Sequence, residues 1–133
     1  MSARLLVVDA SVVVELLRRT ELGDVVATAV RGATLASPAH LDAEVLSALG
    51  RLVRAGDAEP AMVGRALDRL VRLPVERYPI APLVQRAWAL RENIALRDGL
   101  YVACAEMLTA TLLTLDGRLG RSAPVAVEAL PST

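Results

Sequence analysis

Lysine and phenylalanine are missing from this 133-residue sequence, which has one cysteine, one histidine, one tryptophan and two tyrosines. All fifteen basic residues are therefore arginines, and fifteen acidic residues balance them. The net charge of zero gives no general signal for binding a polyanion, so any nucleic acid must be held locally. The absence of lysine also argues against receiver domains and haloacid-type phosphatases, which need a lysine beside their acidic pocket.

Neither a membrane segment nor a disulfide is expected. No apolar stretch approaches the roughly 20 residues that cross a bilayer, because arginines and acids recur throughout. The N-terminus lacks a basic region followed by a signal-type apolar core. We therefore expect a cytoplasmic protein with no membrane contact. The single cysteine, Cys104, lies in an apolar helical pattern and is expected to be a small core residue.

The chain is expected to form one α/β domain spanning residues 1–133, with the last few residues frayed. Short apolar runs predict strands, and longer segments with helical spacing separate them. The expected strands are residues 5–8, 34–36, 75–80, 111–115 and 125–130. One expected helix starts near Ser11, and four others cover residues 39–56, 60–73, 82–93 and 98–109. This alternation predicts an α/β/α sandwich around a mainly parallel sheet.

Two acids follow apolar strands directly. Asp9 comes after residues 5–8, and Asp116 comes after the segment "TLLTL". Ligands of open α/β sheets bind at the carboxyl ends of the strands, so both acids could share one edge. The alternative for each is local: "DAS" can cap a helix, and "DG" is a common turn pair.

Two further acids lie on predicted helices. Helical phasing puts Glu44 at the margin of the apolar stripe of "HLDAEVLSALGRL", where it could reach over the core. Asp42 points away from it and is expected to be a solvated surface acid. Asp98 stands where "NIALRDGLYVACAEML" passes from loop to helix. The alternatives are a surface ion pair of Glu44 with Arg51 or Arg54, and helix capping by Asp98.

Four motifs, in this order, resemble those of PIN-domain ribonucleases, and specifically of the VapC toxins of bacterial toxin–antitoxin pairs. They are "VVDASVVVELL", "HLDAEVLSALGRL", "NIALRDGLYVACAEML" and "TLLTLDGRL". The resemblance spans nearly the whole chain and implies a single PIN-like fold. It also implies that Asp9, Glu44, Asp98 and Asp116 form one metal-binding pocket. Gly99 departs from the alanine usual at its position, a change worth roughly 1 kcal/mol of helix propensity.

The resemblance implies an Mg²⁺-dependent endoribonuclease, with Mn²⁺ as an alternative ion, that leaves a 5′-phosphate and a 3′-hydroxyl. Asp9 and Asp98 would be direct metal ligands, and Glu44 and Asp116 would act through water or help activate the nucleophile. Physical chemistry supports a cation: carboxylates about 6 Å apart repel by roughly 3 kcal/mol per pair at an effective dielectric near 20. Mg²⁺ takes one or two carboxylates and accepts phosphate oxygens.

Other mechanisms fit less well. Metal-free cleavage through the RNA 2′-hydroxyl needs a general acid and base, often two histidines, and this chain has only His40. Neither GxxxxGK[ST] nor GxGxxG is present. With few aromatic side chains for stacking, a folded RNA such as a tRNA or ribosomal loop is favoured as substrate. Supporting or substrate contacts are expected from Ser11, Thr114, Arg97 and Arg118, and further phosphate contacts from Arg51, Arg54 and Arg121.

Partners are expected beside RNA. A mean hydropathy of +0.45 is high for a chain of this size, and apolar residues lie on more than one side of the helices in 39–73. The resemblance implies a homodimer and a cognate VapB-type antitoxin. The alternative to an enzyme is a non-catalytic PIN-like module that binds RNA or protein.

Overall fold

Five parallel strands form the central sheet, which the computed structural model describes within residues 4–130. The strands are β1 (Leu5–Val8), β2 (Thr34–Pro38), β3 (Val75–Tyr78), β4 (Thr111–Thr114) and β5 (Val127–Ala129). Their spatial order is β3-β2-β1-β4-β5, and every neighbouring pair is parallel. The predicted α/β class with a mainly parallel sheet is thus confirmed. The fraying predicted for the last few residues, 130–133, falls on 131–133 outside the described residues, whereas the Leu130 amide donates to the Thr114 carbonyl oxygen at 2.8 Å.

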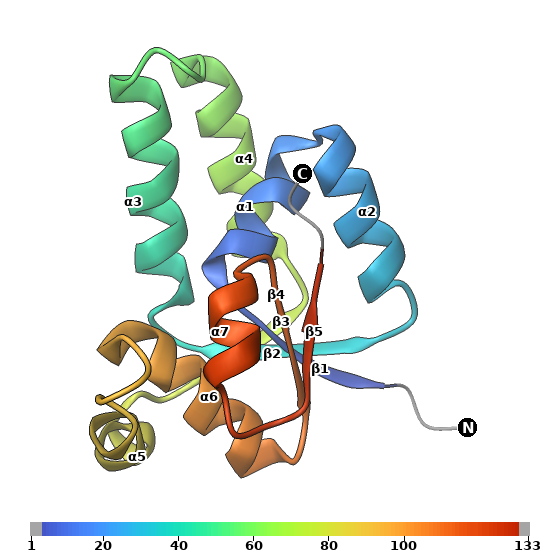
Figure 1. Cartoon of the computed structure of the whole chain (residues 1–133). Helices are drawn as coiled ribbons and strands as arrows, with labels where there is room; N and C mark the ends of the chain where they lie inside the picture. Colours follow the sequence, from blue (N-terminus) through green and yellow to red (C-terminus); the bar gives the residue numbers. More distant parts are fainter. Residues whose placement is uncertain (1–3, 131–133) are drawn as a thin grey trace.

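Seven α-helices and a short 3₁₀ turn surround the sheet within residues 4–130. They are α1 (Ala10–Arg18), α2 (Glu21–Val30), α3 (Leu41–Arg54), α4 (Pro60–Arg72), the 3₁₀ turn η1 (Ala81–Leu83), α5 (Val84–Ala89), α6 (Leu96–Leu108) and α7 (Gly117–Ser122). Helices α1 to α4 lie on one side of the sheet, and α5 and α6 lie on the other (Figure 1). No helix in this part of the chain combines the length and apolar character needed to cross a bilayer.

The central strands are apolar along their length because helices cover both faces of the sheet. In β1, residues 6–8 are almost fully buried, and so are Leu112 and Leu113 of β4. Helix α6 packs against β1, β2 and β4, and its residues 101–105 are all buried. Cys104 belongs to this buried core, as predicted. A rigid central sheet therefore fixes the positions of the two strand-end acids.

Two segments differ from the expected helices. Helix α2 occupies residues for which no element was predicted. In the predicted helix 82–93, regular α-helix covers only Val84–Ala89, and hydrogen-bonded turns follow. Leu90 lies in the turn after α5 and packs against the core, so the apolar pattern of the sequence continues beyond the end of the helix. That turn reverses the chain and brings it back beneath the sheet as α6.

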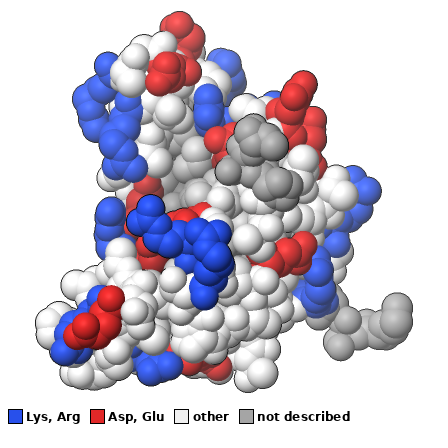
Figure 2. Space-filling model, viewed as in Figure 1, with Lys and Arg blue, Asp and Glu red and all other residues white. Residues whose placement is uncertain are grey.

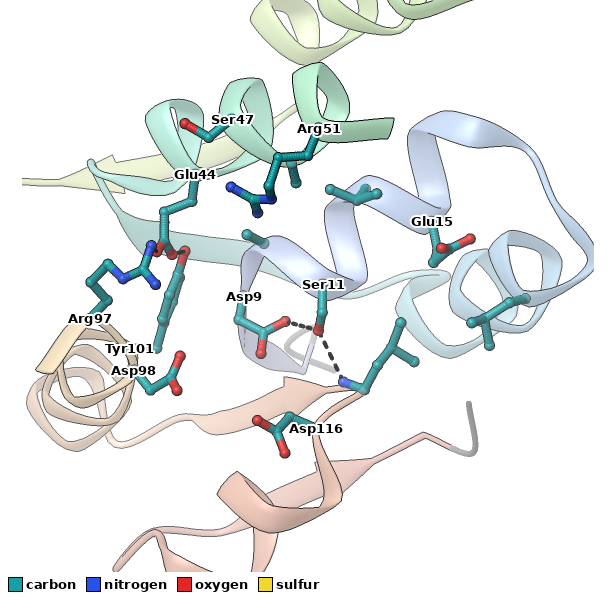
Figure 3. A pocket seen from close by; sticks show the side chains of 15 residues that line it. Asp9, Ser11, Glu15, Glu44, Ser47, Arg51, Arg97, Asp98, Tyr101 and Asp116 are labelled. Atoms are coloured by element: carbon teal, nitrogen blue, oxygen red, sulfur yellow. Dashed lines mark hydrogen bonds and ion pairs between the residues drawn. The ribbon is translucent and has the colours of Figure 1, made fainter. Parts of the chain in front are cut away.

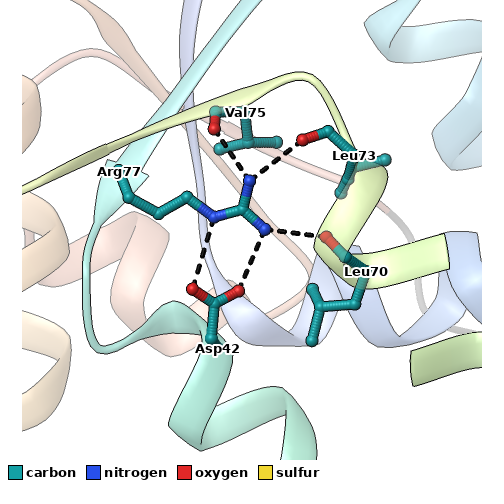
Figure 4. A network of polar contacts seen from close by, with 5 residues as sticks. All are labelled: Asp42, Leu70, Leu73, Val75 and Arg77. Carbon is teal, nitrogen blue, oxygen red and sulfur yellow. Dashed lines mark hydrogen bonds and ion pairs between the residues drawn. The ribbon is translucent and has the colours of Figure 1, made fainter. Parts of the chain in front are cut away.

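One arginine braces the start of α3 against the end of α4. The Arg77 guanidinium donates from Nε and Nη2 to the two carboxylate oxygens of Asp42, at 3.3 and 3.0 Å. It also donates to the carbonyl oxygens of Leu70, Leu73 and Val75, at 2.8 to 2.9 Å (Figure 4). Asp42 lies at the surface as expected, with its side chain 47% exposed, but it is paired with Arg77 and not only solvated. Helical phasing gives the direction of a side chain but not the arginine that it meets.

Candidate active site

Asp9 and Asp116 lie where the order of the strands reverses. Strands β1 and β4 are neighbours, with Val8 paired to Leu113, yet the chain proceeds from β1 toward β3 on one side and from β4 toward β5 on the other. The crossover connections consequently diverge and leave a crevice at the carboxyl ends of these two strands. Asp9 follows β1 directly, and Asp116 lies two residues after the end of β4.

Asp9 is buried and strongly hydrogen-bonded. The residue is only 5% exposed. Its side chain caps α1 by accepting from the amide of Val12 at 3.2 Å. The Ser11 hydroxyl donates to Oδ1 at 2.6 Å, and the Thr114 hydroxyl donates to Oδ2. Burial raises the pKa of Asp9 above its usual range, although these hydrogen bonds lower it. Asp9 therefore both caps α1 and lies in the crevice.

The same two hydroxyls connect the ends of β1 and β4. The Leu115 amide donates to Ser11 Oγ at 3.2 Å, and the Asp116 amide donates to Thr114 Oγ1 at 3.0 Å. Asp9 is consequently oriented by groups from both strands. Ser11 and Thr114 thus support the acids through their hydroxyl groups.

Asp116 and Asp98 face this region from two helices. Asp116 is exposed and caps α7, accepting from the amides of Arg118 and Leu119 at 2.9 and 3.3 Å. Asp98 lies in the first turn of α6, whose cap is Ala95, and makes no capping bond. Burial raises the pKa of Asp98, and repulsion from Asp116 and Glu44 raises it further. Asp98 is therefore within electrostatic reach of both other acids.

Glu44 is held at the side of the crevice. Tyr101, only 1% exposed, donates its hydroxyl to Glu44 Oε1 at 2.7 Å. Arg97 pairs with Oε2 at 3.3 Å, and His40 Nε2 lies 3.5 Å from Oε1. The His40 ring also stacks on Tyr101, with 4.6 Å between ring centroids. Among the described residues, Glu44 is paired with Arg97 and His40, and not with Arg51 or Arg54.

A cavity of about 540 Å³ joins these residues (Figure 3). Asp9, Asp98 and Asp116 point toward its interior, while Glu44 lies beside Tyr101 and Arg97. The acids and their neighbours that line it are Asp9, Ser11, Glu15, Glu44, Ser47, Arg51, Arg97, Asp98, Tyr101 and Asp116. Arg51 extends from α3 toward the acids, as expected for a phosphate contact. Arg97 is instead paired with Glu44, and Arg54 and Arg121 do not line this cavity.

A second cavity, of about 140 Å³, adjoins the first. It shares Asp98 and Asp116 with the larger cavity and extends toward Arg118 and Ser122 of α7. Asn93 and Ile94 form its other side. The pair of acids thus separates two hollows of different size.

The donor set fits a divalent cation. All four side chains offer carboxylate oxygens, the ligands that Mg²⁺ and Mn²⁺ prefer. Burial, and after it repulsion from Asp116 and Glu44, raises the pKa of Asp98, and a bound cation would favour its ionised form. Within residues 4–130, no three Asp, Glu, His or Cys side chains form a ready set of metal ligands. A cation here would therefore use few protein ligands and complete its shell with water and substrate oxygens, as Mg²⁺ commonly does.

Two features of the site were missed or misjudged at the level of sequence. Tyr101 was considered only for stacking on bases, yet its hydroxyl holds Glu44. Its position three residues after Asp98, on the same side of α6, was the available signal. Gly99 has a packing reason: a Cβ there would lie 3.2 to 3.3 Å from Cα, Cβ and O of Ala87 in α5. The missing methyl group allows α5 to approach α6 beside Asp98.

Comparison with known proteins agrees with the fold. Residues 6–123 match the PIN domain family. Ribonuclease VapC3 of Mycobacterium tuberculosis is 46% identical over 90% of this chain and 88% of its own length, and Ribonuclease VapC12 of the same organism is 42% identical over 89% and 92%. The chain therefore belongs to the PIN-domain family and, within it, to the VapC group. The resemblance inferred from the four motifs is confirmed.

Solved structures share the fold at low identity. The crystal structure of PAE2754 from Pyrobaculum aerophilum aligns with a TM-score of 0.68 at 24% identity, covering 94% of this chain and 83% of that one. VapBC2 from Rickettsia felis, bound to a fragment of promoter DNA, aligns with a TM-score of 0.68 at 14% identity, covering 94% and 98%. These similarities establish the PIN architecture independently of close sequence relationship.

Proposed function

We propose that this protein is a divalent-metal-dependent endoribonuclease toxin that hydrolyses phosphodiester bonds in RNA, with tRNA or ribosomal RNA as the substrate class. The observation that carries the proposal is the meeting of Asp9, Asp98 and Asp116 at the strand-reversal crevice. The relationship to the VapC3 and VapC12 ribonucleases supports the same activity.

Asp9 and Asp98 would hold Mg²⁺ or Mn²⁺, and Glu44 and Asp116 would contact it through water or help activate the nucleophile. When bound, such an ion lowers the pKa of a water molecule and neutralises charge on the leaving oxygen. Ser11 and Thr114 hold the Asp9 carboxylate in one orientation.

Glu44 is held in place by its neighbours. Burial and the adjacent Glu44 raise the pKa of Tyr101, so the phenol stays protonated and donates to the carboxylate. Arg97 neutralises the other carboxylate oxygen from the rim. Glu44 would therefore be placed to orient an attacking water or to accept its proton, while Asp9 and Asp98 would hold the ion.

The test is cleavage of purified RNA with and without Mg²⁺ or Mn²⁺. We expect products with 5′-phosphates only when a divalent ion is present. Asp9→Asn and Asp98→Asn should each abolish cleavage, whereas Asp57→Asn, a change at an exposed acid outside both cavities, should leave it unchanged. RNA binding without cleavage by the wild-type chain would support a non-catalytic module instead. Cleavage that persists in both site variants would refute this site.

The partners we propose are a second copy of this chain and a VapB-type antitoxin. Large apolar side chains remain exposed beside a third, almost wholly apolar cavity: Val84 is 47%, Trp88 54% and Leu96 49% exposed. A homodimer that buries this region would remove apolar area from water. Sedimentation should give a dimer for the wild type and a monomer for Trp88→Glu; equal masses would place the dimer contact elsewhere.

A further inference from the structure

The two acidic cavities suggest how a substrate strand crosses the site. Among the residues that the structure describes, only Asp98 and Asp116 line both cavities. A phosphodiester group held at these acids consequently has one side of the strand in the larger hollow and the other side in the smaller. The larger cavity, about 540 Å³, has room for the base, sugar and phosphate of a nucleotide. The smaller cavity, about 140 Å³, is the size of a single base.

The lining of the smaller cavity matches the surface of a nucleotide. Ile94 and Leu119, 5% and 4% exposed, provide apolar walls. Asn93 and Ser122 add an amide and a hydroxyl that can donate and accept hydrogen bonds. A base has apolar faces and polar edges, and RNA readers commonly contact both. The cavity thus offers a contact of each kind.

The arginines around the site differ in whether a nearby carboxylate neutralises their charge. Arg97 is paired with Glu44, but neither Arg51 nor Arg118 has a carboxylate within 4 Å inside residues 4–130. Arg51 lines the larger cavity, and Arg118 lines the smaller one. Basic side chains accordingly gather along α3 and near α7, with acidic atoms between them (Figure 2). Two guanidinium groups are thus available for phosphates on opposite sides of the acids.

We propose that the smaller cavity is a subsite for the one nucleotide adjacent to the bond that is cut. Arg118 holds a phosphate of that nucleotide, and Asn93 and Ser122 contact its base. Arg51 holds the strand on the other side. This inference rests on the proposed function, because it takes RNA as the ligand and the acids as the place of cleavage.

Binding can be tested apart from cleavage with labelled oligo-A, oligo-C and oligo-U RNA in EDTA, with the intact length of each probe checked afterward. Arg118→Gln should weaken binding of all three roughly three- to tenfold and reduce the slope of log affinity against log salt by about 0.7, the value for one phosphate contact on a single strand. Arg121→Gln is the matched control, because it removes an equal charge from α7 outside both cavities. It should change affinity less than twofold.

Base contacts are tested by the double variant Asn93→Ala with Ser122→Ala. It should change the relative affinities for the three probes severalfold, whereas Thr28→Ala, which removes an exposed hydroxyl on α2 outside both cavities, should leave their ratios unchanged. With Mn²⁺ and cellular RNA, the same double variant should shift the base frequencies on one side of the mapped cuts and leave the other side unaltered.

The outcomes separate the subsite from the nuclease. Equal effects of Arg118→Gln and Arg121→Gln, or unchanged probe ratios in the double variant, would overturn the subsite even if the wild type cuts RNA. The expected binding pattern without any cleavage by the wild type would uphold an RNA-binding cavity and refute the nuclease.

Discussion

Four residues with the same functional group occupy four different environments in this site. Asp9 is buried among hydroxyl donors, Glu44 is held by a phenol and an arginine, Asp98 is half-buried near other acids, and Asp116 is exposed on a helix cap. Environments of this kind separate the pKa values and the roles of chemically alike groups. Asp98, which has repelling neighbours and no capping bond, gains most from a cation.

The hydroxyl of Tyr101 can be tested alone, because Tyr101→Phe keeps the buried ring and its contact with His40. The variant loses a hydrogen bond to a charged acceptor, an interaction worth roughly 1.5–3 kcal/mol. We expect kcat for RNA cleavage to fall about tenfold or more while KM changes little, because the misplaced Glu44 acts in the chemical step. Single-turnover cleavage kinetics would measure this split.

Tyr78→Phe is the matched control, since this tyrosine ends β3 and lines neither acidic cavity. It should leave kcat unchanged. A loss of kcat that is equal in both variants would assign the effect to general loosening of the fold. Unchanged kcat in Tyr101→Phe would show that Glu44 needs no such support.

At this scale the sequence located the acids but not their partners. Asp9 and Asp116 were predictable from their positions after apolar strands, and Glu44 from its helical phase. The bond from Tyr101 to Glu44 joins residues 57 positions apart. Such a contact depends on how α3 and α6 are placed by the sheet, so no local spacing encodes it.

At the scale of elements, a close contact joins α1 and α2 at Gly23. A Cβ on this residue would overlap the carbonyl oxygen of Glu15, and that backbone atom cannot rotate away. Gly23→Ala should therefore lower the free energy of unfolding by about 1–3 kcal/mol, the usual range for overpacking. Gly64→Ala, in open space on α4, should instead raise it by up to about 1 kcal/mol through helix propensity. Urea unfolding of the two variants would compare them; equal shifts would contradict the overlap.

The brace between α3, α4 and β3 gives a second prediction for the elements. Arg77→Met keeps an unbranched side chain but removes every donor to Asp42 and to three carbonyl groups. We expect the free energy of unfolding to fall by roughly 2–4 kcal/mol, because several partly buried acceptors lose their partners. Arg72→Met, which breaks only an exposed pair with Asp68, should cost less than about 1 kcal/mol. Chemical denaturation measures both, and similar losses would show that the brace contributes little.

The elements were predictable where local pattern and burial agree. Strands β1 and β4 were expected within a residue of their ends, since each is a short run of strand-forming residues that stops just before an aspartate. The helix predicted over 82–93 was too long, because Leu90 keeps the apolar spacing of a helix although it lies in the turn after α5. Helix α2 was missed, although Thr20 caps it by accepting from the Gly23 amide.

At the scale of the whole molecule, the acidic crevice links stability to pH and to metal. Burial and repulsion raise the pKa of Asp98 in the folded chain above its ordinary value of 3.8. An acid with a raised folded pKa contributes stability below its unfolded pKa and loses that contribution as pH rises through the folded pKa. At neutral pH without metal, the ionised Asp98 thus weakens the fold.

Asp98→Asn should accordingly raise the Tm of the metal-free protein at neutral pH, and the gain over wild type should vanish as pH falls below about 4. Taking the difference between the two proteins cancels the titration of acids that do not interact with Asp98, and leaves Asp98 with its coupling to Asp116 and Glu44. Mn²⁺ should stabilise the wild type by mass action, by about 2.7 kcal/mol at a hundredfold excess over its dissociation constant, and so raise its Tm; the variant should gain much less. Thermal melts across pH with EDTA or Mn²⁺ measure both effects. A lower Tm for Asp98→Asn at neutral pH, or equal stabilisation of both proteins by Mn²⁺, would contradict a strained carboxylate that a cation relieves.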